Sequence, residues 1–126
     1  MKYRELPELV GEPLGWDMFN VANSNGQENR IERAFLLHAC NRQIDHVKWV
    51  SRLLLCVFTS DKHGKCVAFL EVNDMEGRVL SETVGIRATS VQYIRDNAWQ
   101  AIQFLENVEV RADIPMAELH QLIESL

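Results

Sequence analysis

The sequence predicts one α+β domain: an antiparallel β-meander of three or more strands packed against two C-terminal helices, with an irregular N-terminal segment and one further helix. Two observations predict the sheet and the helices. Apolar runs alternate with polar, glycine-containing turns over residues 52–86, and apolar residues recur at helical spacing after residue 89. The length of 126 residues, with 47% hydrophobic and 25% charged side chains, suits a single core for residues 1–126.

Residues 1–27 are expected to form an irregular segment that packs on the core. They hold breakers such as Pro7 and Gly11, together with several asparagines, and these residue types favour turns. Trp16 and Phe19 are interspersed among them, and large aromatic side chains stabilise a protein mainly when they are buried. The segment is therefore expected to cover part of the domain.

Residues 28–51 leave two alternatives open, a helix or a strand. One set of residues has the helical spacing i, i+3, i+4, i+7: Ile31, Ala34, Phe35 and His38. Asn29 is a suitable N-cap, so a helix is favoured at the start of this stretch. A strand over residues 34–40 is the alternative. A turn is expected near residues 41–45, followed by a strand from about Lys48.

The clearest elements follow in residues 52–86. Three runs rich in aliphatic and β-branched residues, 52–59, 66–72 and 78–86, read as strands. Two polar connections that contain glycine, 60–65 and 73–77, separate them. Strand–turn–strand signals in succession predict antiparallel neighbours, and hence a meander.

Two helices are predicted after the meander. Thr89 and Gln92 have the spacing of a capping box, and this first helix has an apolar stripe at Val91, Ile94, Ala98, Ala101, Ile102 and Leu105. Asp113 is expected to cap the second helix, with Pro115 in its first turn. The second helix has its own apolar face at Met116, Leu119, Leu122, Ile123 and Leu126.

The turns also predict a strand register. A first turn over residues 61–64 places Cys56 opposite Phe69, and a second turn over residues 73–78 places Val72 opposite Val79. In this register Cys56 and Cys66 lie on opposite faces of the sheet.

Both faces of the predicted sheet are largely apolar, whereas an antiparallel sheet with one wet face alternates apolar and polar residues. Both faces are therefore expected to be covered, one of them by the C-terminal helices. Residues 1–45 could cover the other face. Alternatively a second copy of the chain could do so, which would make the protein a homodimer that associates through a sheet face or edge.

Arg52, Glu71 and Glu82 fall on the same face in this register, near neighbouring strand ends. Two carboxylates beside a guanidinium could act as an acid/base pair or bind a polar or cationic ligand. The alternative is an ordinary cross-strand ion pair at the sheet periphery. These three residues are the candidate ligand-binding site.

Other functional classes receive no support from the sequence. The ligand pairs typical of zinc sites, the phosphate-binding glycine loops and the hydrolase motifs do not occur, so no catalytic residue, metal or cofactor is expected. The net charge of -5 and the lack of a basic run make nucleic-acid binding unexpected. The longest apolar run, residues 53–58, is far shorter than the ~20 residues of a membrane-spanning helix.

The expected function is that of a small non-enzymatic interaction protein, homodimeric or bound to another protein. The three cysteines, an odd number without dense spacing, suggest reduced thiols and a cytoplasmic location. The alternative is a small ligand-binding domain or enzyme with a pocket between sheet and helices that uses Glu71, Glu82 and Arg52.

Overall fold

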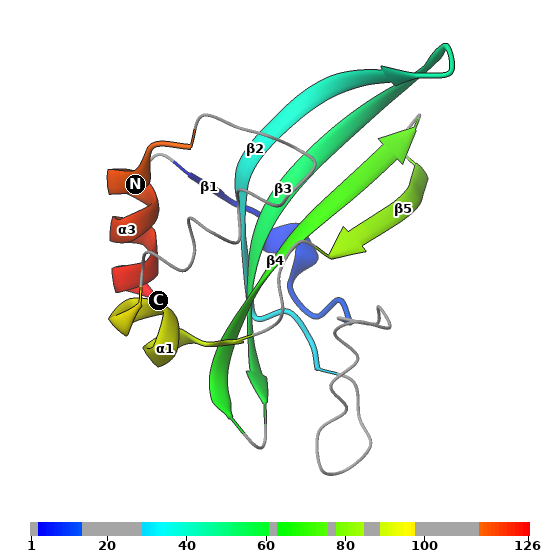
Figure 1. The fold of residues 1–126 in the computed structure, drawn as a ribbon. Helices are drawn as coiled ribbons and strands as arrows, with labels where there is room; N and C mark the ends of the chain where they lie inside the picture. Colours follow the sequence, from blue (N-terminus) through cyan, green and yellow to red (C-terminus); the bar gives the residue numbers. More distant parts are fainter. Residues whose placement is uncertain (1–2, 14–28, 61–62, 76–77, 85–88, 98–113) are drawn as a thin grey trace.

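The computed structural model describes residues 3–13, 29–60, 63–75, 78–84, 89–97 and 114–126 (Figure 1). In chain order the elements are β1 (Arg4–Glu5), the 3-10 helix η1 (Pro7–Leu9), β2 (Arg33–Ile44), β3 (Val47–Ser60), β4 (Gly64–Met75), β5 (Arg78–Val84), β6 (Thr89–Ser90), α1 (Val91–Asp96) and α3 (Met116–Ser125). Every strand pairing is antiparallel, in the order β1-β2-β3-β4-β5, and β6 pairs with β4. An α+β fold with a β-meander therefore agrees with the prediction.

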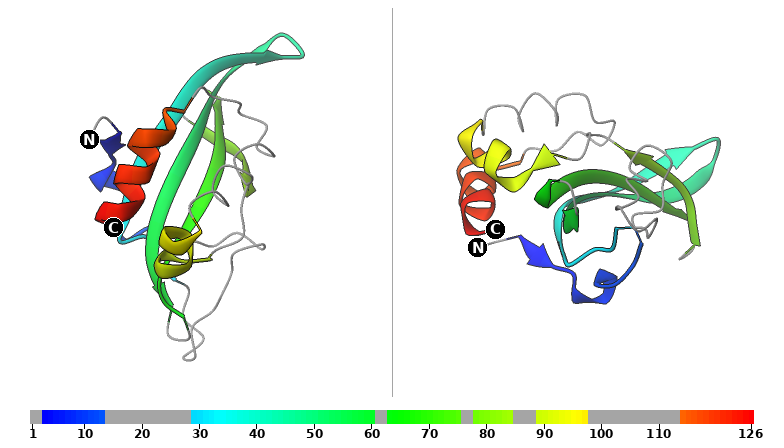
Figure 2. Two further views of the ribbon diagram at one scale, coloured as in Figure 1. Left: turned by 60° about the vertical axis from the view of Figure 1, so that its left-hand side comes forward. Right: turned by 90° about the horizontal axis from the view of Figure 1, so that it is seen from below.

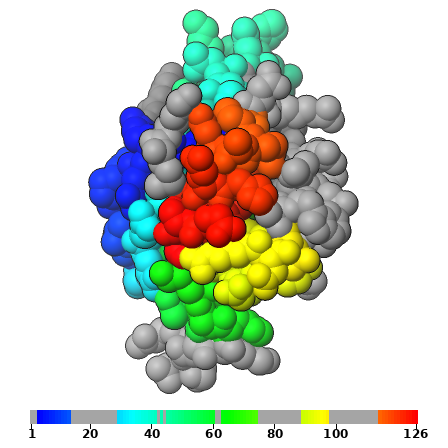
Figure 3. All heavy atoms as spheres, turned by 90° about the vertical axis from the view of Figure 1, so that its left-hand side faces the viewer, coloured from blue at the N-terminus to red at the C-terminus, as the bar shows by residue number. Residues whose placement is uncertain are grey.

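Helices α1 and α3 lie side by side on one face of the sheet (Figures 2 and 3). Leu119, Leu122 and Ile123 of α3 and Ile94 of α1 are buried against the sheet residues of this face, namely Phe35, Leu37, Leu53, Leu55, Val57, Val67 and Phe69. The apolar face predicted for the last helix is thus the face that packs, with Leu119, Leu122 and Ile123 at its centre.

The opposite face of the sheet is also buried, and the same chain buries it. Its residues Leu54, Cys56, Phe58, Cys66, Ala68, Leu70 and Val72 form a second core cluster with Leu6, Ile31 and Ala34. Leu6 comes from the N-terminal segment and is 1% exposed, so residues 3–13 contribute to this cluster. Trp16 and Phe19 lie outside the described residues. A second copy is therefore not needed to cover either face.

The favoured helix at the start of residues 28–51 is wrong, and the alternative strand is correct. Strand β2 covers residues 33–44, with β3 beginning at Val47. Because both sheet faces are apolar here, successive residues such as Ala34 and Phe35 are both buried, in different clusters. The alternation that identifies a half-buried strand is therefore missing, and a helical spacing results by coincidence.

The predicted register of the β3–β4 hairpin is wrong by one residue. Ser60 pairs with Gly64, and Cys56 pairs with Ala68 instead of Phe69. Gly64 has φ +69°, a left-handed conformation that glycine adopts without the strain of a side chain. A slip of one residue exchanges the two faces of β4, so Cys56 and Cys66 lie on the same face instead of opposite faces. Both are free thiols.

The predicted register of the β4–β5 hairpin is wrong as well. Val72 pairs with Glu82 instead of Val79, and a β-bulge lies between Asn73 and Asp74. Pairing extends to Met75 and Arg78, so the connection is shorter than the predicted turn over residues 73–78 and shifts the register by two residues. The bulge adds a third.

The helix caps differ from the prediction. Ser90, not Thr89, caps α1, because the Ser90 hydroxyl accepts the Tyr93 N–H at 3.1 Å. Thr89 instead pairs with Val67 in β6. Helix α3 begins after Pro115 and has no side-chain cap hydrogen bond. The predicted cap Asp113 lies outside the described residues, as do the positions from 98 to 105 of the first predicted helix.

Candidate functional site

Arg52 and Glu71, two of the three predicted site residues, lie on opposite faces of the sheet. Arg52 pairs with Val72 and lies on the face of the second core cluster, whereas Glu71 pairs with Leu53 on the helix-covered face. Glu71 is 1% exposed, so its carboxylate is not at a surface where an outside ligand would reach it. The backbone of Glu82, in β5, pairs with Val72 along the edge of β4 that faces away from β3.

The acidic partner of Arg52 is Asp74, which the sequence reasoning missed. The Arg52 guanidinium and the Asp74 carboxylate form a partly buried ion pair at 2.6 Å. Asp74 is two positions along β4 from Val72, the residue that pairs with Arg52, so the contact is a diagonal cross-strand pair. The sequence could have indicated it only through the correct register, since Asp74 was placed in a turn.

A second polar contact lies on the helix-covered face of the same strands. The buried Ser51 hydroxyl donates to Asn73 Oδ1 at 2.5 Å, and these two residues are direct register partners. Glu71, two residues before Asn73 in β4, is on the same face. The polar residues thus form cross-strand contacts on both sides of the sheet.

The β2–β3 hairpin projects beyond the rest of the sheet as an arm, here defined as residues 41–50 (Figures 1 and 2). Pairing of β3 with β4 starts at Val50, so the arm beyond this point is two-stranded. A two-residue turn closes the arm: Ile44 pairs with Val47, and Asp45 and His46 have φ values of 50° and 66°. Positive φ at both central residues is the signature of a type I′ turn.

The surface of the arm includes apolar side chains. Val47 and Val50 are 36% and 42% exposed, and Trp49 between them is half-buried. Val47 and Trp49 share one face of the hairpin, because side chains alternate along a strand, and Val50 lies on the other face.

Within the described residues, the outer edge of β2 is unpaired over most of its length. Strand β2 has 12 residues, but β1 pairs only with Leu36 and Phe35. Next to this pairing, the Ala34 carbonyl accepts the N–H of Leu6 at 2.8 Å. No other strand in the described part of the chain pairs with the edge from His38 to Ile44. Such an edge presents unpaired N–H and C=O groups and is a template for another strand.

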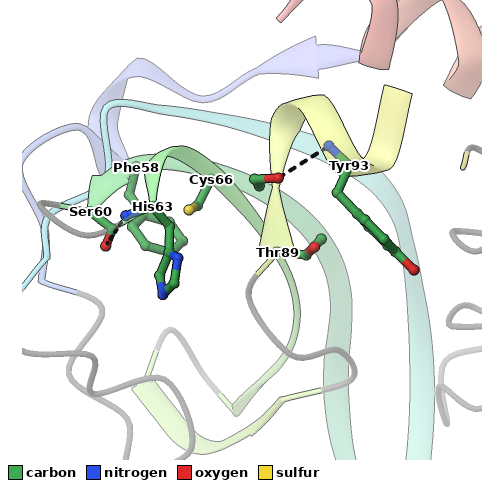
Figure 4. A pocket seen from close by; sticks show the side chains of 7 residues that line it. Phe58, Ser60, His63, Cys66, Thr89 and Tyr93 are labelled. Carbon is green, nitrogen blue, oxygen red and sulfur yellow. Dashed lines mark hydrogen bonds between the residues drawn. The ribbon is translucent and has the colours of Figure 1, made fainter. Parts of the chain in front are cut away.

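A pocket of about 370 Å³ lies at the opposite end of β3 from the arm (Figure 4). It is lined by Phe58, Ser60, His63, Cys66, Thr89, Ser90 and Tyr93. The side chains of His63 and Tyr93 stand on opposite sides of it in Figure 4, with Cys66 and Thr89 between them in this view.

The thiols of Cys56 and Cys66 do not have the properties of nucleophiles. Burial raises the pKa of the Cys56 thiol to about 12 and raises the pKa of the Cys66 thiol in the same direction. Both therefore remain protonated at neutral pH, whereas a catalytic cysteine needs the thiolate. Among the described residues, no group of three or more His, Cys, Asp or Glu side chains is placed to hold a metal ion.

Comparisons with protein-family models, with curated proteins and with solved structures give no match. None of the helices in the described ranges has the length and apolar character to span a membrane.

Proposed function

We propose that this protein is a non-enzymatic interaction protein that self-associates by pairing the outer edge of β2 with β2 of a second copy. The observation that carries the proposal is the open edge from His38 to Ile44 on a 12-residue strand. Natural proteins usually block a long edge with charges, proline or a covering segment, because an open edge recruits other strands. Strand addition uses main-chain hydrogen bonds for affinity.

The two-residue turn determines which backbone groups of β2 point away from β3. Residues that flank such a turn, here Ile44 and Val47, exchange hydrogen bonds with each other, and the direction alternates along each strand. The N–H and C=O groups of Gln43, Asn41 and Ala39 therefore point outward. All three side chains are exposed and uncharged, so none of them opposes an approaching strand by charge.

A second copy is the occupant that we propose, because the open edge is complementary to itself. Antiparallel pairing about a two-fold axis at Asn41 places Ala39 opposite Gln43 of the second copy, so all outward groups meet outward groups. The same register places Cys40 opposite position 42 of the second copy. Val47 and Val50 then lie on β3, the strand next to the proposed interface.

The first test is the molar mass in solution. We expect a concentration-dependent monomer–dimer equilibrium in analytical ultracentrifugation. Ala39→Pro removes one outward N–H and leaves the β2–β3 bonds intact, since proline is tolerated at edge positions whose N–H faces outward. It is expected to shift the equilibrium to monomer, whereas Ala39→Ser, which keeps the N–H, is not. Circular dichroism checks that both variants are folded.

The second test uses Cys40, the one cysteine that is not buried. In the proposed register, Cys40 and Cys40 of the second copy lie on one sheet face in diagonal positions, roughly 7–8 Å apart. A short bis-maleimide should therefore cross-link wild-type dimers, and Cys40→Ser should abolish the product. A strict monomer at every concentration, or cross-linking that is the same in Ala39→Pro, overturns the proposal.

A further inference from the structure

The pocket is the second feature of the surface that offers a binding site, and it is separate from the proposed interface. Its residues come from the C-terminal end of β3, the start of β4, β6 and α1. The arm lies at the other end of β3. A ligand in the pocket and a second copy on the β2 edge would therefore not compete for the same residues.

The pocket combines an apolar floor with a polar rim. Phe58 and Cys66 are buried, 1% and 3% exposed, whereas Tyr93 is 44% exposed. The Cys66 thiol donates to the Gly64 carbonyl at 3.4 Å and is thus already engaged. The Ser90 hydroxyl accepts the Tyr93 N–H at 3.1 Å, which leaves its own proton to donate. Thr89 adds a second hydroxyl at the rim.

The charges of the lining residues restrict the class of ligand. The described residues that line the pocket include no Asp, Glu, Lys or Arg, so these residues supply neither a carboxylate for a cation nor a cluster of strong bases for a phosphate. Among the described lining residues, His63 is the one basic side chain. Within the described part of the chain, no ion pair or side-chain hydrogen bond holds its imidazole, which is therefore available to a ligand.

We propose that the pocket binds a small one-ring aromatic carboxylate. Its ring would contact the exposed Tyr93 ring above the buried Phe58, and its carboxylate would accept hydrogen bonds from the His63 imidazole and from the hydroxyls of Thr89 and Ser90. The volume of about 370 Å³ is at the small end of the range for ligand pockets and suits a single ring. An aromatic floor with a few hydrogen-bond donors at one side is the usual composition of such a site.

The test is a titration followed by ¹⁵N–¹H NMR. Benzoate and 4-hydroxybenzoate are the probes, and benzylamine, which has the same ring and the opposite charge, is the control. We expect saturable shifts for at least one carboxylate, gathered at the amides of His63, Cys66 and Tyr93, and no saturable shifts with benzylamine. His63→Gln should weaken binding by about three-fold, the size of an exposed charge contact.

His120→Gln is the matched control, because His120 is exposed on α3 and is not part of the pocket. It should leave the affinity unchanged. Any one of three results overturns the proposal: neither carboxylate saturates, benzylamine binds as well as benzoate, or His63→Gln binds as tightly as the wild type. The dispersion of the NMR spectrum reports whether each variant is folded.

Discussion

The type I′ turn at the tip of the arm permits a sharp test of the fold. Asp45 and His46 both have positive φ, which side chains disfavour and glycine does not. The preferred sequence for this turn is Asn-Gly or Asp-Gly, and here histidine stands at the position where glycine is preferred. We therefore expect His46→Gly to stabilise the hairpin and His46→Val, which introduces a β-branched side chain, to destabilise it.

The size of the effect follows from two opposing contributions. Relief of the left-handed conformation is worth ~1 kcal/mol, the low end of the usual range, because histidine tolerates this region better than most residues. Glycine also makes the unfolded chain more flexible, which costs ~0.5 kcal/mol. The net gain from His46→Gly is ~0.5 kcal/mol, or a shift in Tm of about 2 °C for a domain of this size. His46→Val should lose ~1 kcal/mol.

Two measurements check this prediction. Urea unfolding gives the global free energy, and amide hydrogen exchange at Trp49, the register partner of Arg42, gives the local opening of the arm. Since the arm is two-stranded, the change in exchange at Trp49 should be at least as large as the global change. If His46→Val is as stable as His46→Gly in both measurements, the turn does not have the conformation described above.

Three further predictions concern the cap, the core and the thiols. Ser90→Ala should lose ~1 kcal/mol of stability in urea unfolding because the cap bond to α1 is removed, whereas Thr89→Ala should lose less. Leu122→Ala should lose ~3 kcal/mol in the same assay, because Leu122 is fully buried between helix and sheet. Iodoacetamide followed by mass spectrometry should modify Cys40 in the native protein and Cys56 only after unfolding, since burial raises the pKa of Cys56 to about 12.

The parts of the fold that the sequence predicts are those with a single clear pattern. The meander is recognisable because polar, glycine-containing connections interrupt the apolar runs over residues 52–84. Helix α3 is recognisable because it packs on one side only, so its buried residues, such as Leu119 and Ile123, keep the helical spacing. In both cases local propensity, pattern and packing agree.

Strand β2 could not be predicted with the same certainty, for two physical reasons. Both of its faces are buried where it crosses the core, so the period of two is absent from the sequence. Its hairpin turn also lacks the glycine that usually marks a type I′ turn, because His46 occupies that position. The open edge that carries the proposed function belongs to this strand, and it was therefore not visible in the sequence.

The candidate charge cluster depended on a register that apolar residues alone do not determine. When both faces of a sheet are apolar, a slip of one residue exchanges one apolar face for another at little cost in burial. Glu71 was therefore assigned to the face of Arg52, and Asp74, beside the bulge, was assigned to a turn. For the β3–β4 hairpin, the error in connection length is a single residue.

The polar contacts supply the register information that the apolar residues lack. With the predicted pairing, Ser51 would be opposite Asp74 and Arg52 opposite Asn73, so both observed contacts would be lost. In the structure, the Ser51–Asn73 hydrogen bond lies on one face and the Arg52–Asp74 ion pair on the other. A slip of one residue would exchange these contacts for Ser51–Asp74 and Arg52–Asn73 pairs, so the ion pair would be replaced by hydrogen bonds to neutral groups, at a cost of roughly 1 kcal/mol. We infer that these four residues serve mainly to select one register of a sheet whose two sides are otherwise alike.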